Sequence, residues 1–346
     1  MSDQPDDIVV VSCGLRTPIG TNTALSAAGV RAKVSRLMAH RYLRDEEQEA
    51  IYIGQALYID EEQEGIERHL QLAEPAISEA LSQLPQGAGE VRCFVGLPEL
   101  RAGLPENLQH VLLKDRSSEF ISHGHASGLM ALEKGMRCLE SGEAEFCLVG
   151  GIDSYINPFT LKELERIGRL YCSYQKKGFT PGEAAGFCLL CTRFTAEKFG
   201  LSYSAIIRSV AVTEESAYWE TKQNCKGKGL SKAVGEVLKS LPQGEGIGKI
   251  YTTLNGEKYH LTEFGYTLAR FTEKIIDGKN FIAPVDCWGD IGAASAPVFI
   301  GLVTEAARKG YAEGAFSLIC TSSLGKLRAA ALLETNTTEP NEDIWL

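Results

Sequence analysis

The sequence contains no run of about 20 apolar residues, the length that a helix needs to cross a bilayer. Its start, Met1–Asp7, is polar and acidic, and lacks the basic and apolar parts of a secretory signal. We therefore expect a cytoplasmic protein with no membrane span. Positive charge is also in the minority, because 35 Lys and Arg stand against 45 Asp and Glu. This excludes nucleic acid as an expected partner, since phosphate contacts need clustered Lys and Arg.

Cysteine patterns that would indicate disulfides or a metal centre are also lacking, although the chain has ten cysteines. The CxxC pair at Cys188–Cys191 has no second pair and no histidine beside it. Both lie in an apolar segment, so buried small hydrophobic side chains are expected there. A chain of 346 residues can bury an ample core without disulfides or metals. We expect no cofactor and no metal.

Charged and polar segments are expected at the surface. The acidic stretches Asp45–Glu49 and Asp60–Glu67 are interpreted as solvated. Residues 336–346 form a polar surface tail whose last residues, Trp345 and Leu346, could dock on another surface.

Hydrophobic patterns predict alternating strands and helices. Buried strands are expected at residues 7–14, 91–97 and 146–151, and helices at 70–84 and 127–141. This order predicts an α/β fold with buried sheets between helical layers.

Two segments of the chain resemble each other. Residues 79–87 (EALSQLPQG) and 236–244 (EVLKSLPQG) each end an apolar helix and precede a strand whose following loop ends in Glu. Phe120–Ile121 and Phe281–Ile282 then each lead to a polar residue beside glycine and a further helix. The pattern predicts a tandem duplication. We expect an N-terminal half at residues 1–194, a C-terminal half at 195–335, and the tail.

Five segments resemble motifs of the β-ketoacyl synthases: residues 7–20, 144–154, 179–190, 286–298 and, more weakly, 322–333. Together they span nearly the whole chain. The resemblance implies an α/β thiolase-like fold with duplicated halves in an αβαβα layered arrangement.

The resemblance also locates three catalytic positions, and each holds a different residue here. The nucleophilic cysteine is matched by His125. The first family histidine is matched by Asn255, with Thr253 as a competing match, and the second by Asp290. An acyl-imidazole is too readily hydrolysed to store an acyl chain. A carboxylate at Asp290 would repel a malonyl carboxylate or an enolate. Claisen condensation is therefore not expected.

Two uses remain open for His125 and Asp290, which we expect at equivalent positions of the two halves. They could form a base with its orienting carboxylate, giving a hydrolase or acyltransferase that acts on acyl thioesters. They could instead fill the vacated site as a structural pair. Ser127 lies nearby but lacks a nucleophile elbow, so a packing role is expected.

Other histidines and cysteines are candidates for metal binding or for a catalytic cysteine. His123 and His125 form an H-x-H pair that, with Asp290, could bind a metal. A true 3-oxoacyl synthase would need a cysteine elsewhere, and the candidates are Cys13 and Cys287. The remaining histidines are expected at the surface or hydrogen-bonded: His40, His69, His110 and His260.

The function expected from these patterns is that of a ketosynthase-like scaffold or accessory protein, a pseudoenzyme. Ketosynthases form dimers near the nucleophile helix, so the resemblance implies a homodimer through residues His110–Ser122. The other partners considered are an active ketosynthase for which this chain is the silent subunit, an acyl-carrier protein, and a secretion effector. The corresponding settings are fatty acid biosynthesis and bacterial type VI secretion.

Overall fold

The computed structural model describes residues 6–114 and 116–335 of the chain. Within these residues it forms a ten-stranded sheet and a separate two-stranded one. The N-terminal part contains β1 (Ile8–Arg16), α1 (Thr23–Arg31), β2 (Leu37–Arg44), β3 (Ala50–Gly54), α2 (Gly65–Ala80), η1 (Leu81–Gln83), β4 (Val91–Leu97), α3 (Leu108–Val111), β5 (Ser118–Ser122), η2 (Gly124–Ala126), α4 (Ser127–Glu140), β6 (Phe146–Ser154), α5 (Pro158–Arg166), β7 (Glu183–Thr192) and α6 (Arg193–Phe199). The C-terminal part contains β8 (Ala205–Glu214), η3 (Trp219–Thr221), α7 (Lys228–Val237), η4 (Leu238–Ser240), β9 (Ile247–Thr252), α8 (Lys258–Arg270), η5 (Thr272–Lys274), β10 (Phe281–Ile282), α9 (Val285–Trp288), η6 (Gly292–Ala294), α10 (Ser295–Arg308), β11 (Phe316–Ser322) and β12 (Leu327–Thr335).

The same strand order occurs twice in the large sheet. One end runs β5-β4-β6-β7-β1 and the other β10-β9-β11-β12-β8, so each half orders its strands third, second, fourth, fifth, first. The fifth strand is antiparallel to both neighbours in each half. The first strands join the halves through a short antiparallel ladder between Ile8–Val10 and residues 205–207. This repeated topology confirms the predicted duplication.

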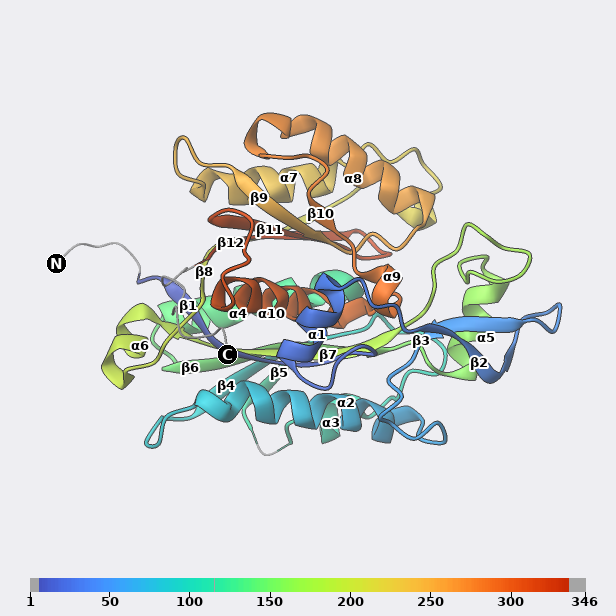
Figure 1. Cartoon of the computed structure of the whole chain (residues 1–346), viewed down its shortest axis with the longest axis horizontal. Coiled ribbons are helices and arrows are strands. Elements are labelled where there is room, and N and C mark those ends of the chain that lie inside the picture. The colour runs from blue at the N-terminus through green and yellow to red at the C-terminus, as the bar shows by residue number, and fades with distance from the viewer. Residues whose placement is uncertain (1–5, 115, 336–346) are drawn as a thin grey trace.

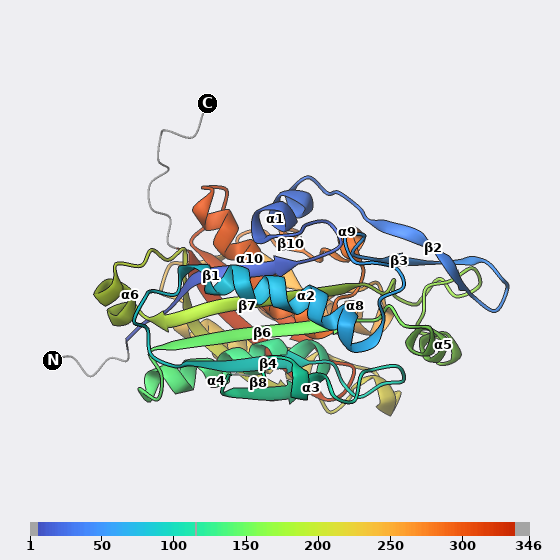
Figure 2. The ribbon, with the colours of Figure 1, turned by 90° about the horizontal axis from the view of Figure 1, so that it is seen from below.

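Five layers are visible in Figure 1, with α7 and α8 above, α2 below, and α4 and α10 between the two sheet halves. The predicted αβαβα arrangement is confirmed. From below, α2 covers β1, β6 and β7, while the β2–β3 hairpin extends to one side (Figure 2). No helix among the described residues is long and apolar enough to span a membrane.

The central helices are rich in small residues because they pack closely. A Cβ added to Gly128 of α4 would lie 2.8 Å from Pro297 Cδ of α10. Every residue of α10 from Ser295 to Ala307 is buried. Ser127 lies at the start of α4, is fully buried, and donates hydrogen bonds to the carbonyls of Leu97 and Gly124, which supports its packing role.

The turns before these helices show which residues are equivalent. Gly124 and Gly292 both have positive φ, of 65° and 49°, a conformation that favours glycine. The serine three residues after each one donates its hydroxyl to that glycine's carbonyl. His125 is therefore equivalent to Ala293, and Asp290 lies three residues earlier. Our expectation that His125 and Asp290 are equivalent is wrong, because the repeat is set by the turn glycines.

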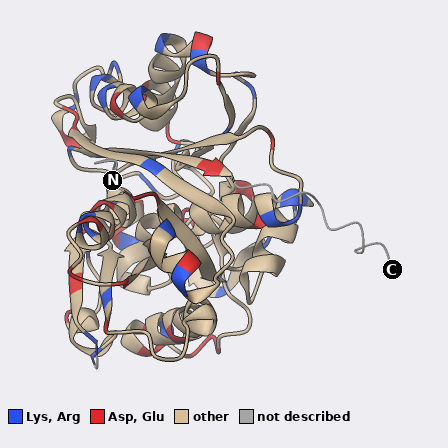
Figure 3. Ribbon diagram, turned by 90° about the vertical axis from the view of Figure 1, so that its left-hand side faces the viewer, with Lys and Arg blue, Asp and Glu red and all other residues tan. Residues whose placement is uncertain are grey.

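The acidic stretches, the expected division of the chain and the tail can also be compared with the structure. The acidic side chains of residues 60–67 are exposed, but Asp45 is only 2% exposed and accepts hydrogen bonds from the backbone N–H groups of Glu49 and Ser173. The expected division between residues 194 and 195 falls within α6 and stays a prediction. The tail, with Trp345 and Leu346, lies outside the described residues. Basic and acidic residues are interspersed along the ribbon (Figure 3).

Candidate functional site

The candidate site lies where both halves of the sheet end against the central helices. His125 lies in η2, between β5 and α4. Asp290 precedes η6, and its backbone N–H and carbonyl bond to Thr180 and Gly182. Asn255 follows β9. The fold thus brings together three residues that are separated by up to 165 positions in the chain.

Asp290 is the centre of the cluster. Its Oδ1 lies 2.7 Å from Nε2 of His125 and accepts the backbone N–H of Gly292 at 2.9 Å. Its Oδ2 accepts the side-chain amide of Asn255 at 2.8 Å. All three side chains are buried, so each bond forms where water does not compete. Thr253 is not in this cluster, and its hydroxyl accepts the backbone N–H of Ser322.

The histidine and the carboxylate favour each other's charged forms. Burial alone would lower the pKa of His125, but the charge and hydrogen bond of Asp290 raise it above 6.5. Burial alone would raise the pKa of Asp290, but His125, Asn255 and the Gly292 N–H hold it well below its usual range. The arrangement favours an imidazolium–carboxylate pair over two neutral groups.

A second layer of buried polar residues supports Asn255. Glu257 accepts the amide of Asn255 at 3.0 Å and pairs with the Arg169 guanidinium at 2.6 and 2.8 Å. Burial would raise the pKa of Glu257, and its bonds to Arg169 lower it. His260 Nε2 lies 3.8 Å from the same carboxylate, and burial lowers the pKa of His260 to about 4. These residues fix the position of Asn255.

Asp153, near the end of β6, places a second carboxylate against the start of η6. Its Oδ2 accepts the backbone N–H of Ala293 at 3.0 Å, and its other oxygen pairs with Arg101. The Arg101 guanidinium also lies 4.1 Å from the Tyr155 ring centroid. The helix N-terminus that could hold an incoming anion is therefore already occupied by the chain's own carboxylates.

Sequence analysis missed Asp153, Glu257 and Arg169. Asp153 lies near the end of β6, two residues after Gly151, and Glu257 ends the loop after β9 that the repeat singled out. Polar residues at the ends of buried strands were the available signal. Nothing in the sequence pairs Arg169 with a residue 88 positions away.

A cavity of about 420 Å³ opens beside His125. Its lining includes Arg101, Tyr155, Arg169 and Trp219, together with the acidic residues Glu99 and Glu220. None of the described residues that line it is a cysteine. The cavity is large enough for a small organic group, and its lining carries charges of both signs.

The other candidates lie away from this cluster. His123 is exposed whereas His125 is buried, and the only His/Cys/Asp/Glu group with metal-ligand spacing in the described chain includes neither. Cys13 lies on β1 with its sulfur 3.4 Å from that of Cys188, and Cys287 is buried in α9. Cys188 and Cys191 are both fully buried on β7, as expected for small hydrophobic side chains.

Of the remaining histidines, His110 is exposed, and His40 accepts the backbone N–H groups of Tyr42 and Leu43. His69 and His260 are both buried, and of the two only His69 fits the expectation of a surface or hydrogen-bonded histidine. His69 keeps a hydrogen bond to the Gly65 carbonyl. His260 Nδ1 has no partner among the described residues. Both sit on inward faces of helices, which a single histidine does not reveal.

Comparison with known proteins agrees with this architecture. Residues 117–196 match the family described as "Beta-ketoacyl synthase, N-terminal domain". A type II polyketide ketosynthase solved with its acyl-carrier protein superposes with a TM-score of 0.81, at 15% identity, over 96% of this chain and 100% of that one. A ketosynthase of Xenorhabdus doucetiae in complex with its chain length factor gives 0.74, at 15% identity, over 97% and 100%.

The chain has the thiolase-like fold of these ketosynthases. Curated proteins similar to this chain include the 6-methylsalicylic acid synthase of Aspergillus terreus, 26% identical over 132 residues. That match covers 36% of this chain and 7% of the relative, so the chain spans only a small part of the relative's length. A second relative, from Aspergillus clavatus, is 23% identical over 36% of this chain and 8% of its own length.

Proposed function

We propose that this ketosynthase-like protein does not catalyse Claisen condensation and serves as a binding subunit within a larger assembly. The observation that supports it is the buried pair of His125, at the turn before α4, and Asp290. Nε2 of His125 lies 2.7 Å from Oδ1 of Asp290. In the condensing enzymes that this chain resembles, the position matched by His125 holds a cysteine. A cysteine thiolate can hold an acyl chain as a thioester, and a hydrogen-bonded imidazole cannot.

The charge of the site supports the same proposal. Decarboxylation of a malonyl thioester builds negative charge, which an active site must stabilise. Asp290, Asp153 and Glu99 all act on His125 as negative charges. The positive charges of Arg101 and Arg169 are taken up by Asp153 and Glu257. An enolate would therefore meet carboxylates where it needs donors.

The proposed assembly forms through β5. This strand ends the large sheet and, among the described strands, pairs only with β4, so its outer edge is available to another strand. A second copy of this chain or an active ketosynthase are the proposed partners, and acyl-carrier protein is a proposed ligand of the assembly. Among the solved structures with this fold, one contains a ketosynthase with its acyl-carrier protein and another contains a ketosynthase with its chain length factor.

A second candidate is an enzyme that processes acyl thioesters with His125 as base, which the adjoining cavity and Asp290 favour. The bond between His125 and Asp290 weighs against it, because the Asp290 carboxylate raises the pKa of His125 and so favours the charged imidazolium over the neutral base. A cytoplasmic location, fatty acid biosynthesis and type VI secretion stay predictions.

The proposal is tested by measuring carbon dioxide release from malonyl-acyl-carrier protein, with and without an acyl-thioester primer. We expect no release above the protein-free background. His125→Ala serves as the matched variant, and an active ketosynthase as the positive control. Release that depends on His125 would overturn the proposal, and so would formation of a 3-oxoacyl product by this chain alone.

A further inference from the structure

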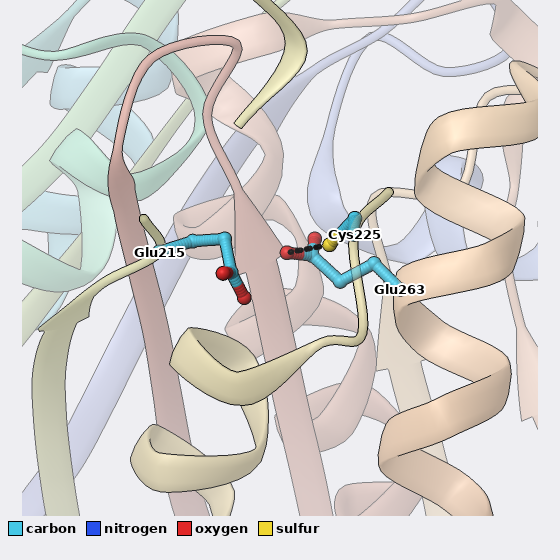
Figure 4. Close-up of side chains that lie close together, drawn as sticks. All are labelled: Glu215, Cys225 and Glu263. Carbon is cyan, nitrogen blue, oxygen red and sulfur yellow. Dashed lines mark hydrogen bonds between the residues drawn. The ribbon is translucent and has the colours of Figure 1, made fainter. Parts of the chain in front are cut away.

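A cluster of buried metal-ligand side chains lies apart from the candidate site. Glu215 follows β8, Cys225 precedes α7, and Glu263 is on α8. One ligand atom from each lies within 4.8 Å of the other two. They are 2%, 5% and 1% exposed. Figure 4 shows the Glu215 carboxylate facing the Glu263 carboxylate and the Cys225 sulfur.

One carboxylate oxygen of this cluster has no hydrogen-bond donor among the described residues. Glu263 Oε1 accepts Arg328 Nε at 2.6 Å and the Cys225 thiol at 3.7 Å. Glu263 Oε2 is buried and has no hydrogen-bond partner among the described residues. A buried carboxylate oxygen without a donor is costly. The arginine orients the carboxylate through one oxygen and leaves the other free to bind a ligand, as supporting residues do at metal sites.

The charges of the cluster are also unbalanced. Two carboxylates, Glu215 and Glu263, face one guanidinium, that of Arg328, and leave one negative charge uncompensated in a buried place. A coordinating thiol loses its proton. A divalent cation bound by both carboxylates and the Cys225 thiolate would bring these groups and Arg328 to neutrality.

The spacing suits a tetrahedral ion with sulfur and oxygen ligands. Bond lengths of about 2.3 Å to sulfur and 2.0 Å to oxygen place two such ligands about 3.5 Å apart on zinc. The Cys225 sulfur lies 3.7 Å from Glu263 Oε1, which places it beside the carboxylate whose other oxygen, Oε2, is free to bind the ion. Glu215 accepts the backbone N–H groups of Ala217 and Gly229, which hold its carboxylate in place and leave lone pairs available.

We propose that Glu215, Cys225 and Glu263 bind one zinc ion, with water as the fourth ligand. The ion would tie together the end of β8, the loop before α7, and α8. The same loop carries Trp219 and Glu220, which line the cavity beside His125. The ion would therefore hold one wall of that cavity in place. This proposal does not depend on whether the protein condenses acyl chains.

The test is metal content and cobalt substitution in the full chain, purified with a thiol reductant and without chelator. We expect about one equivalent of zinc by mass spectrometry. After removal of zinc, cobalt(II) should give a thiolate-to-metal charge-transfer band in the near ultraviolet. Cys225→Ser should abolish the band and weaken zinc binding by about 100-fold. Cys172→Ser is the matched control, because Cys172 is also 5% exposed and should leave both unchanged.

Circular dichroism would show whether Cys225→Ser has folded. If it has not, Glu215→Gln provides a second variant, since its amide oxygen can still accept the backbone donors. Less than a tenth of an equivalent of metal in the native protein, with no band in the cobalt-treated chain, would overturn the proposal. A band that Cys225→Ser and Glu215→Gln both retain would do the same, and so would stoichiometric binding of a monovalent ion in place of zinc.

Discussion

His125 and Asp290 depend on each other for their charge. Without its partner, each group would be pushed by burial toward its neutral form. Together they form one buried pair, with Asn255 and the Gly292 N–H completing the contacts of the carboxylate. Removing one partner should therefore change the protonation of the other.

Asp290→Asn should lower the pKa of His125, because burial then acts with less opposition. The measurement is a histidine titration by NMR, with the resonance assigned through His125→Gln. Asp286→Asn is the matched control, since Asp286 is exposed on α9, four residues away. A His125 pKa that is the same in the wild type and in Asp290→Asn would contradict the pairing.

The stabilisation that the pair contributes is lost both above and below a certain pH range. The folded pKa of His125 is raised, so its contribution is full below about 6.5 and is lost as pH rises through the folded value. The folded pKa of Asp290 is depressed, so its contribution is present above about 3.8 and is lost as pH falls through the folded value. The pair stabilises the fold most between these limits.

His260 should have the opposite effect. Its pKa falls to about 4 on folding from an ordinary 6.5, so the unfolded chain binds a proton over this range and the folded chain does not. This should cost about 2 kcal/mol of stability between pH 7 and pH 5. His260→Phe should remove that loss, as measured by urea unfolding at both pH values. His110→Phe, at an exposed position, should not.

An unchanged difference between pH 7 and pH 5 in His260→Phe would contradict this role. The sequence could not have suggested it. His260 was expected at the surface or hydrogen-bonded, and only its burial beside Glu257, with Nδ1 unpaired, makes its protonation costly. By contrast, the cluster of His125, Asn255 and Asp290 followed from motif matches alone, because each residue lies within or next to a segment that resembles a family motif.

At the scale of elements, the sequence predicts strands and helices better than it predicts the ion pairs between them. The β4, α4 and β6 segments were predicted nearly to the residue because their apolar patterns are long and uninterrupted. The Arg169–Glu257 and Arg101–Asp153 pairs were not, since their partners lie 88 and 52 positions apart in the chain. Local periodicity carries no information on such contacts.

The open edge of β5 predicts association. Phe120 is half-buried on this strand, and a lysine there should block strand pairing across the edge. Phe120→Lys should change the mass by light scattering from twice 37.6 kDa to 37.6 kDa. Phe194→Lys is the control, because Phe194 is 68% exposed on α6 and should leave the dimer intact. A monomeric wild-type protein would contradict the homodimer, and so would a dimer that survives Phe120→Lys.

On the scale of the whole molecule, duplication explains both the fold and the site. Two halves with one strand order meet at their first strands and enclose α4 and α10. Each half contributes a glycine turn to the centre, but only the first turn places a histidine there, and the second places Ala293. The repeat in the sequence was visible at the LPQG turns, whereas the exact pairing of site residues required the structure.

The central claim is that the site cannot hold an acyl chain or condense one. The most direct test is the intact mass of the protein after incubation with acyl-coenzyme A or acyl-carrier protein. We predict the unmodified mass, because the described residues that line the cavity include no cysteine and His125 is hydrogen-bonded to Asp290. A stoichiometric acyl adduct that maps to His125, or to any cysteine, would contradict the claim.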